Sequence, residues 1–360
     1  MGYLTKSSSQ IDPLYIRYIA LLGASGHGKS SLLKALDEFR LPVHDDINVN
    51  ETKFAYGQSF LISFDPEYDG KESKFLLNIL DTPGRTDLFE EIPPILQVAD
   101  GCLLVVDCAE GVTNQLKMCL EHALSMQVRP VLFINKIDRM MFEFNANPED
   151  IYKNILEIIE ELNSIISLRS AGDFDKLRLD PEKGNVIFGS TLDGWAFSLE
   201  DFARIYSVKF GIDPKKLIQK FWGENYYDIS QKKLVQESKG GTLSRSFNAF
   251  ILTPIFKLIE AIMQGKNSLD KMLKSLGIVR NDADLHLKGR DLLRKIMSTW
   301  LNHSRAIKQI LISQIPFPVI TQPERVSILY KGNLEDDFAN GIRTCDPEGP
   351  FIGYVFKMLP

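Results

Sequence analysis

The sequence is poor in cysteine and has no long apolar run. Its 360 residues include Cys102, Cys108, Cys119 and Cys345, and no two of these form a CxxC pair. This spacing suggests neither a zinc ribbon nor a disulfide framework, so a reducing compartment is expected. Residues Met1 to Pro13 are polar, and no apolar stretch is long enough to span a bilayer. A cytoplasmic or nuclear compartment is the default, and we predict a cytoplasmic protein with no membrane partner.

The sequence also lacks a large excess of charge. Its formal net charge is -5, with 25% charged and 44% hydrophobic residues. This balance argues against a broad surface that coats nucleic acid, and no direct sequence-specific nucleic-acid binding is expected. The length and apolar content suffice for two domains with a substantial core.

The first half of the chain alternates strand-like and helix-like segments. Apolar runs typical of strands buried on both faces of a parallel sheet lie at 15–22, 59–64, 75–80, 102–106, 131–134 and 186–188. Helical patterns lie between them, such as the one that begins at Asn147 with Pro148 in its first turn. This alternation predicts an α/β fold with a doubly wound sheet.

The pattern changes after about residue 199. Helical stretches such as 246–263 and 291–300 dominate, and the polar segment 232–241 reads as a loop. After residues 315–318 the chain turns strand-like again. These changes predict a helix-rich inserted subdomain that follows the α/β domain.

A phosphate-binding loop follows the first predicted strand. Gly23-Ala24-Ser25-Gly26-His27-Gly28-Lys29-Ser30 fits the pattern GxxxxGK[ST], and a helical stretch starts at Ser31. Glycines let the backbone N–H groups face phosphate oxygens at a helix N-terminus. We predict that Lys29 neutralises the β- and γ-phosphates and that Ser30 ligates Mg²⁺, whereas His27 is interpreted as a structural loop residue.

Two further loops follow predicted strands in the order that a nucleotide site requires. Asp81-Thr82-Pro83-Gly84 provides a carboxylate for Mg²⁺ and, at Gly84, a backbone N–H for the γ-phosphate. Asn135-Lys136-Ile137-Asp138 provides a carboxylate that accepts hydrogen bonds from guanine N1–H and N2–H₂, which adenine does not offer. Lys136 is predicted to cover one face of the base and Asn135 to tie this loop to the phosphate loop. Ser190-Thr191-Leu192 is predicted to complete the base pocket.

Several stretches resemble eukaryotic and archaeal elongation factor 2, in register over nearly the whole chain. They include residues 107–112, 129–132, 135–139, 189–197, 221–227, 254–257 and 345–350. The resemblance implies a GTPase (G) domain at 1–200, an inserted subdomain at 201–299, a return to the G domain at 300–325, and the beginning of a truncated β-barrel domain at 326–360. It also implies GTP or GDP and Mg²⁺ as ligands, and the ribosome as partner.

The sequence departs from the family at functional positions. Arg85 replaces the histidine that orients the attacking water, and Gly26 replaces an aspartate of the phosphate loop. An arginine has no acceptor lone pair, so we expect Arg85 to weaken hydrolysis, and the catalytic assignment is Lys29, Gly84 and Arg85. The first switch is shortened, and Thr52 is the best candidate for its Mg²⁺-binding threonine. Pro93-Pro94 is expected to interrupt the following helix.

Three functions remain open at this point. The first is a GTP-hydrolysing translation factor related to elongation factor 2. The second is a GTP-binding module with little hydrolysis, which Arg85 and the altered first switch favour. The third is an elongation-factor-like GTPase of ribosome maturation or of the spliceosome. The family's later domains are absent, so we expect a fragment, one half of a split factor or a diverged copy.

Overall fold

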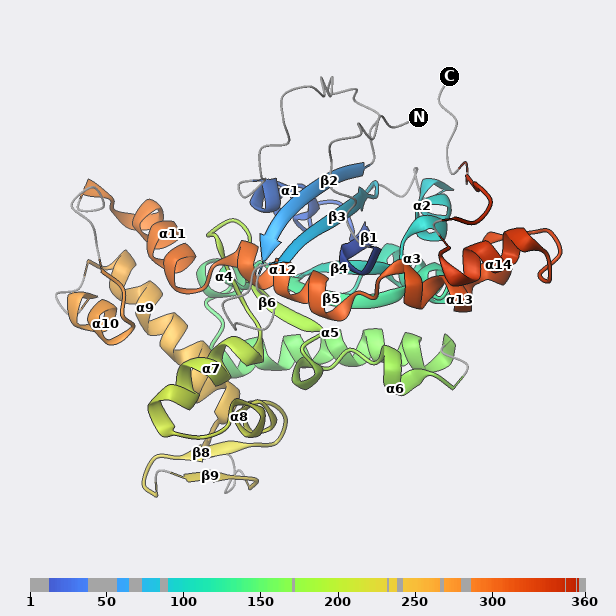
Figure 1. The fold of residues 1–360 in the computed structure, drawn as a ribbon. Coiled ribbons are helices and arrows are strands. Elements are labelled where there is room, and N and C mark those ends of the chain that lie inside the picture. Colours follow the sequence, from blue (N-terminus) through green and yellow to red (C-terminus); the bar gives the residue numbers. More distant parts are fainter. Residues whose placement is uncertain are drawn as a thin grey trace.

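The computed structural model describes residues 13–37, 57–64, 73–84, 90–169, 172–231, 233–237, 242–265, 269–279, 286–346, 348–353 and 355. A seven-stranded sheet in the order β2-β3-β1-β4-β5-β6-β7 forms its centre (Figure 1). Its strands are β1 (Ile16–Leu22), β2 (Gly57–Phe64), β3 (Ser73–Asp81), β4 (Gly101–Asp107), β5 (Arg129–Asn135), β6 (Val186–Ser190) and β7 (Trp195–Phe197). The five inner strands pair in parallel, and the edge strands β2 and β7 are antiparallel.

Helices cover both faces of this sheet. The helices of the α/β part are α1 (Lys29–Asp37), α2 (Ile92–Val98), α3 (Asn114–Ser125), α4 (Ile137–Phe142), α5 (Pro148–Arg169), α6 (Phe174–Leu177) and α12 (His303–Gln314), with short turns η1 (Pro13–Tyr15) and η3 (Pro181–Lys183). Strand β1 shows the layering, because Ile19 and Leu21 pack with α1 and α12, whereas Ala20 and Leu22 pack with α2, α3 and α5. A parallel sheet buried on both faces is the doubly wound α/β fold that the sequence predicts.

A helix-rich region follows β7. It contains α7 (Leu199–Phe210), α8 (Pro214–Phe221), the π-helical turn η4 (Asn248–Leu252), α9 (Thr253–Met263), α10 (Leu269–Ser275) and α11 (Gly289–Trp300), with a small sheet of β8 (Tyr226–Asp228), β9 (Lys233–Val235) and β10 (Ser244–Arg245). Figure 1 shows these elements on one side of the main sheet and α13 (Pro318–Leu329) and α14 (Asp337–Thr344) at another end. Within the described ranges, no helix has the length and apolar content needed to cross a bilayer.

Three local expectations from the sequence are wrong. The prolines Pro93 and Pro94 lie in the first turn of α2, where a missing N–H leaves no helical hydrogen bond unmade, so they begin the helix rather than interrupt it. The segment 232–241 contains strand β9, which pairs with β8. The chain after Pro318 is helical and not strand-like, because buried contacts of α13 with the α/β core override the local pattern.

The expected domain boundaries remain a prediction. The described residues after 326 form the end of α13 and then α14, and none of them is in a strand. The start of a β-barrel at 326–360 is therefore not visible in this part of the chain.

A buried carboxylate joins α13 to the sheet. Asp100, which is 4% exposed, precedes β4 and accepts hydrogen bonds from the Thr321 hydroxyl (2.5 Å) and from the Tyr18 backbone N–H (3.3 Å). Burial raises the pKa of Asp100 from 3.8 to about 6, although the hydrogen bond from Thr321 and the charge of Arg325 act in the opposite direction. The ionised form is therefore less stable in the folded protein than in the unfolded chain.

We expect Asp100→Asn to change how stability depends on pH. Because the folded pKa lies above the unfolded value, the stability that Asp100 contributes is fully present below about pH 4 and is lost as the pH rises through about 6. The loss amounts to about 3 kcal/mol in the wild-type protein. An asparagine stays neutral, so the unfolding free energies of the two proteins should diverge between pH 4 and pH 7. The other carboxyl groups titrate alike in both proteins. Parallel curves of unfolding free energy against pH for the two proteins would therefore contradict the prediction.

Candidate functional site

The predicted site residues follow neighbouring strands at one edge of the sheet. The phosphate loop follows β1, Asp81 ends β3, Asn135 ends β5 and Ser190 ends β6. Strands β3, β1, β4, β5 and β6 are adjacent and parallel, so their carboxyl ends meet at the same edge. In open α/β sheets this edge is where ligands bind.

The phosphate loop has the tight backbone that its glycines predict. Gly28 has a φ of +103°, and a Cβ at this position would lie 2.3 Å from Asn135 Nδ2, so only glycine fits. Lys29 begins α1, and its Nζ donates to the carbonyl oxygens of Gly23 (2.5 Å) and Ala24 (3.1 Å). Burial lowers the pKa of Lys29, although the charge of Asp81 acts in the opposite direction. The ammonium is thus held inside the loop that would surround a phosphate.

The loop after β3 lies against the phosphate loop. A Cβ on Gly84 would meet Lys29 Nζ at 2.6 Å and the Ser25 N atom at 2.9 Å, and the Thr82 hydroxyl donates to the Leu21 carbonyl (2.6 Å). Burial raises the pKa of Asp81, opposed by the charge of Lys29. Asp81 Oδ1 is buried and finds no hydrogen-bond partner within the described residues. An unpartnered carboxylate oxygen beside a loop lysine fits a hard, water-carrying cation such as Mg²⁺.

Asn135 connects three loops, of which the sequence predicts the link to the phosphate loop. Its Nδ2 donates to the His27 carbonyl oxygen (2.9 Å), and its Oδ1 accepts from the Thr191 N–H (3.0 Å). Both the side chain and the backbone of Asn135 are buried at the end of β5. One carboxamide therefore fixes the phosphate loop, the Asn135–Asp138 loop and the Ser190–Leu192 loop relative to one another.

Asp138 lies in the first turn of α4 and is almost fully buried. Burial raises the pKa of Asp138, whereas the Ser190 hydroxyl and the charge of Arg290 act in the opposite direction. Its Oδ2 accepts from Arg290 Nη2 (2.9 Å), and its Oδ1 has no hydrogen-bond partner among the residues that the structure describes. The carboxylate lies next to the loops that Asn135 joins.

A polar network lies behind the phosphate loop. The Lys136 Nζ contacts Asp107 Oδ2 (2.9 Å), which also accepts from Arg139 Nη1 (2.9 Å). Although burial acts in the opposite direction, the hydrogen bonds from Lys136 and Arg139 lower the pKa of Asp107. The fully buried His27 ring lies 3.3 Å from the Val105 carbonyl oxygen and 3.3 Å from Glu110 Oε2, and burial lowers the pKa of its imidazole. This placement agrees with a structural role for His27.

The structure adds residues to the site that the sequence does not reveal. Arg290 and Arg294, both from α11, reach the Asn135–Asp138 and Ser190–Leu192 loops, with Arg294 Nε donating to the Leu192 carbonyl oxygen (3.0 Å). Arg290 Nε also donates to Asp193 Oδ1 (2.7 Å). No motif marks these arginines, because 152 residues separate Arg290 from Asp138. Two predicted site residues, Thr52 and Arg85, lie outside the described residues.

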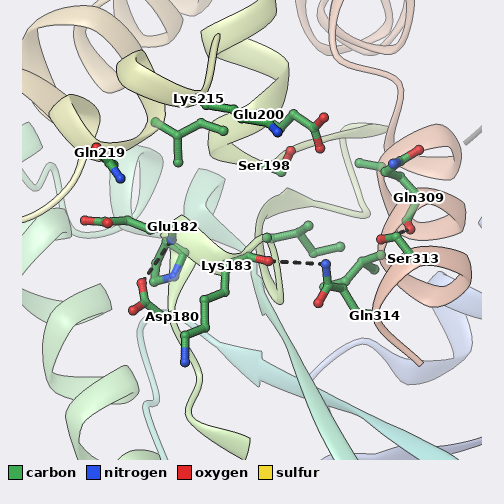
Figure 2. A pocket seen from close by; sticks show the side chains of 16 residues that line it. Asp180, Glu182, Lys183, Ser198, Glu200, Lys215, Gln219, Gln309, Ser313 and Gln314 are labelled. Carbon is green, nitrogen blue, oxygen red and sulfur yellow. Dashed lines mark hydrogen bonds between the residues drawn. The ribbon is translucent and has the colours of Figure 1, made fainter. Parts of the chain in front are cut away.

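A cavity of about 520 Å³ lies at the other edge of the sheet (Figure 2). Its walls come from the segment that precedes β6, such as Asp180 and Lys183, and from α7, α8 and α12, such as Glu200, Lys215 and Gln314. Gln314 Nε2 donates to the Lys183 carbonyl oxygen (3.2 Å) across this cavity. None of the residues predicted from the motifs lines it, so it is separate from the edge where those residues lie.

Comparison with known proteins gives one family and a distant structural similarity. The profile of the family described as Elongation factor Tu GTP binding domain matches residues 14–266. Among solved structures, the chain is similar to translation elongation factor SelB from Methanococcus maripaludis in complex with the GTP analogue GPPNHP, with 20% sequence identity and a TM-score of 0.34. That similarity covers 49% of this chain and 30% of the SelB chain. Because the family profile extends over most of its length, from the strand before the phosphate loop to the end of α9, this chain belongs to the elongation factor Tu GTP-binding domain family of translational GTPases.

Proposed function

We propose that this GTPase binds Mg·GTP at the carboxyl edge of its sheet and hydrolyses it slowly, as a diverged relative of elongation factor 2 that acts on the ribosome. The observation that carries the proposal is the buried Asn135 side chain, whose contacts gather the phosphate loop and the two base-side loops into one site. The resemblance to elongation factor 2 over most of the sequence supports the ribosomal role.

The residues of the phosphate side have distinct roles in this proposal. Lys29 neutralises the β- and γ-phosphates, taking phosphate oxygens in place of the carbonyl oxygens of Gly23 and Ala24. Ser30 and Asp81, with Thr52 from the first switch, would hold Mg²⁺, which when bound neutralises charge that develops on the γ-phosphate. The Gly84 backbone N–H, next to Lys29, is placed to donate to the γ-phosphate.

The residues of the base side select guanine. Asp138 accepts from N1–H and N2–H₂, and a Ser190–Leu192 backbone N–H donates to O6. A buried carboxylate left without these donors is costly, so adenine nucleotides should bind far more weakly. In this proposal Gly23–Ser31, Asp81 and Gly84 serve the phosphates and Mg²⁺, and Asn135–Asp138 with Ser190–Leu192 form the base pocket.

A second candidate is a GTP-binding module with negligible hydrolysis. The observation that favours it is Arg85, which stands where the resembled family has a water-orienting histidine. A guanidinium donates hydrogen bonds and does not accept them, so it contacts phosphate but does not orient an attacking water. Such a protein would act by its conformation or by occupying a ribosomal site.

We expect Arg85→His to raise ribosome-stimulated GTP turnover about 100-fold, the scale of a positioned general acid or base. Single-turnover release of phosphate from GTP, measured with and without ribosomes, would test this. Affinity for GTP should change little, because the substitution acts on the attacking water. An Arg178→His variant, at a side chain that is 49% exposed in the segment before β6, is the matched control.

The outcomes separate the candidates. Rapid ribosome-stimulated turnover by the unmodified chain would rule out the binding-module candidate, and no gain in Arg85→His would show that Arg85 is not the limiting defect. Preferential co-sedimentation with ribosome precursors or spliceosomal particles would instead support an assembly GTPase. Equal affinity for guanine and adenine nucleotides would refute the proposed site itself.

A further inference from the structure

Helix α11 of the helix-rich region places the Arg290 guanidinium at the predicted base pocket. Arg290 Nη2 donates to Asp138 Oδ2 (2.9 Å), and Figure 1 shows α11 beside α4, which carries Asp138. The same guanidinium is anchored by Asp193, through Nε to Oδ1 (2.7 Å) and Nη2 to Oδ2 (3.2 Å). A single planar fork thus links two carboxylates from two different loops.

The Asp138 carboxylate is buried and already hydrogen-bonded in this arrangement. Its side chain is 6% exposed, Oδ2 is engaged by Arg290, and Oδ1 is buried without a hydrogen-bond partner in the described part of the chain. Guanine would need this carboxylate to accept from both N1–H and N2–H₂ at once. In the observed arrangement Oδ2 already accepts from Arg290, so the base has to compete with this guanidinium for the carboxylate.

We propose that Arg290 is a gate on the guanine pocket, which holds Asp138 when no nucleotide is bound and must release it before the base binds. This inference rests on the proposed function, because it assumes that Asp138 recognises guanine. It assigns to the helix-rich region a role in nucleotide affinity and exchange that the motifs of the α/β domain do not include.

The surroundings of Arg290 make such a release feasible. Its side chain is 43% exposed, whereas the Asp193 side chain is fully buried and stays available as an anchor. The guanidinium carbon also lies 5.7 Å from the centre of the Phe142 ring, a distance that allows a cation–π contact. Arg290 therefore keeps two of its contacts when it gives up Asp138.

The gate predicts an effect opposite in sign to that of simple electrostatics. A cation near the binding site attracts a polyanionic nucleotide, so its removal by charge alone should weaken binding. If Arg290 instead competes with guanine for Asp138, its removal should strengthen binding. The direction of the change in affinity is therefore decisive.

We expect Arg290→Gln to bind a fluorescent GDP analogue about tenfold more tightly than the wild-type chain, the effect of removing one competing charge-assisted hydrogen bond. Most of the gain should be in the association rate constant, measured by stopped flow. In the wild type, where release precedes binding, the observed rate should reach a plateau as nucleotide concentration rises, and this plateau should be raised or lost in the variant. Arg204→Gln on α7, which removes the same charge far from Asp138, should match the wild type.

Weaker or unchanged binding by Arg290→Gln would overturn the gate, provided that its thermal unfolding matches that of the wild type. Arg290→Lys serves as a second variant if the first is unstable, because it keeps the charge but lacks the fork that joins Asp138 to Asp193. It should also bind GDP more tightly. Failure of the proposed function is distinguishable, since the wild-type chain would then show no preference for guanine nucleotides at any concentration.

Discussion

Asp138→Asn should lower the affinity for GTP by about 1,000-fold or more and make the chain prefer xanthosine triphosphate. Guanine presents two donors, N1–H and N2–H₂, whereas xanthine presents N1–H and a carbonyl oxygen. A carboxylate accepts from both guanine donors, while an asparagine accepts from N1–H and donates to the xanthine carbonyl. Equilibrium binding of GTP, xanthosine triphosphate and ATP to both proteins would measure the exchange of preference.

The matched control is Glu182→Gln, which makes the same change of charge and shape at the cavity of Figure 2. It should leave all three affinities unchanged. Loss of all nucleotide binding by Asp138→Asn, with normal thermal unfolding, would mean that Asp138 supports the loop and does not read the base. An unaltered preference for GTP would remove Asp138 from the site.

Sequence patterns predict most of the α/β core. The apolar runs at 15–22, 75–80 and 131–134 correspond to β1, β3 and β5, because strands buried on both faces must be continuously apolar. The motif residues can be predicted to lie together because each follows a strand in the sequence. In a parallel sheet the carboxyl ends of adjacent strands meet at one edge. The tie between Asn135 and the phosphate loop is likewise confirmed.

The elements that the sequence does not predict depend on contacts between distant residues. The local sequence pattern of residues 318–329 favours a strand over a helix. These residues form helix α13, in which Thr321 and Arg325 are buried. Arg290 meets Asp138 only because the helix-rich region folds back on the base-side loops. Helix propensity and residue spacing describe residues that are close in the sequence, so neither predicts a contact between residues that are far apart in it.

Arg325 shows how these long-range contacts hold the α/β domain together. This arginine of α13 is 2% exposed, and its Nε and Nη atoms donate to four carbonyl oxygens, those of Met126, Ala99, Leu96 and Gln97. The last three lie at the carboxyl end of α2, and Met126 lies at the carboxyl end of α3. Helix ends leave carbonyl oxygens without partners, and a cation there also complements the helix dipole.

Arg325→Met should therefore destabilise the protein by about 3–5 kcal/mol, the scale expected when one partner of a buried charged network is removed. Methionine retains much of the volume but leaves the carbonyl oxygens of two helix ends buried and unpaired. The melting temperature should fall by roughly 10 °C, measured by circular dichroism. Arg325→Lys should give an intermediate value, because an ammonium lacks the planar fork.

Arg178→Met, at a side chain that is 49% exposed, is the control for loss of an arginine from the surface, and it should change stability by less than about 0.5 kcal/mol. Asp100 gives a second check on the assignment, since the charge of Arg325 lowers the pKa of that carboxyl group. In Arg325→Met this opposition is lost, and the pKa of Asp100 should rise further. The stability lost between pH 4 and pH 7 should then be greater in the variant than in the wild type, whereas equal stabilities at all pH values would show that α13 does not anchor the ends of α2 and α3.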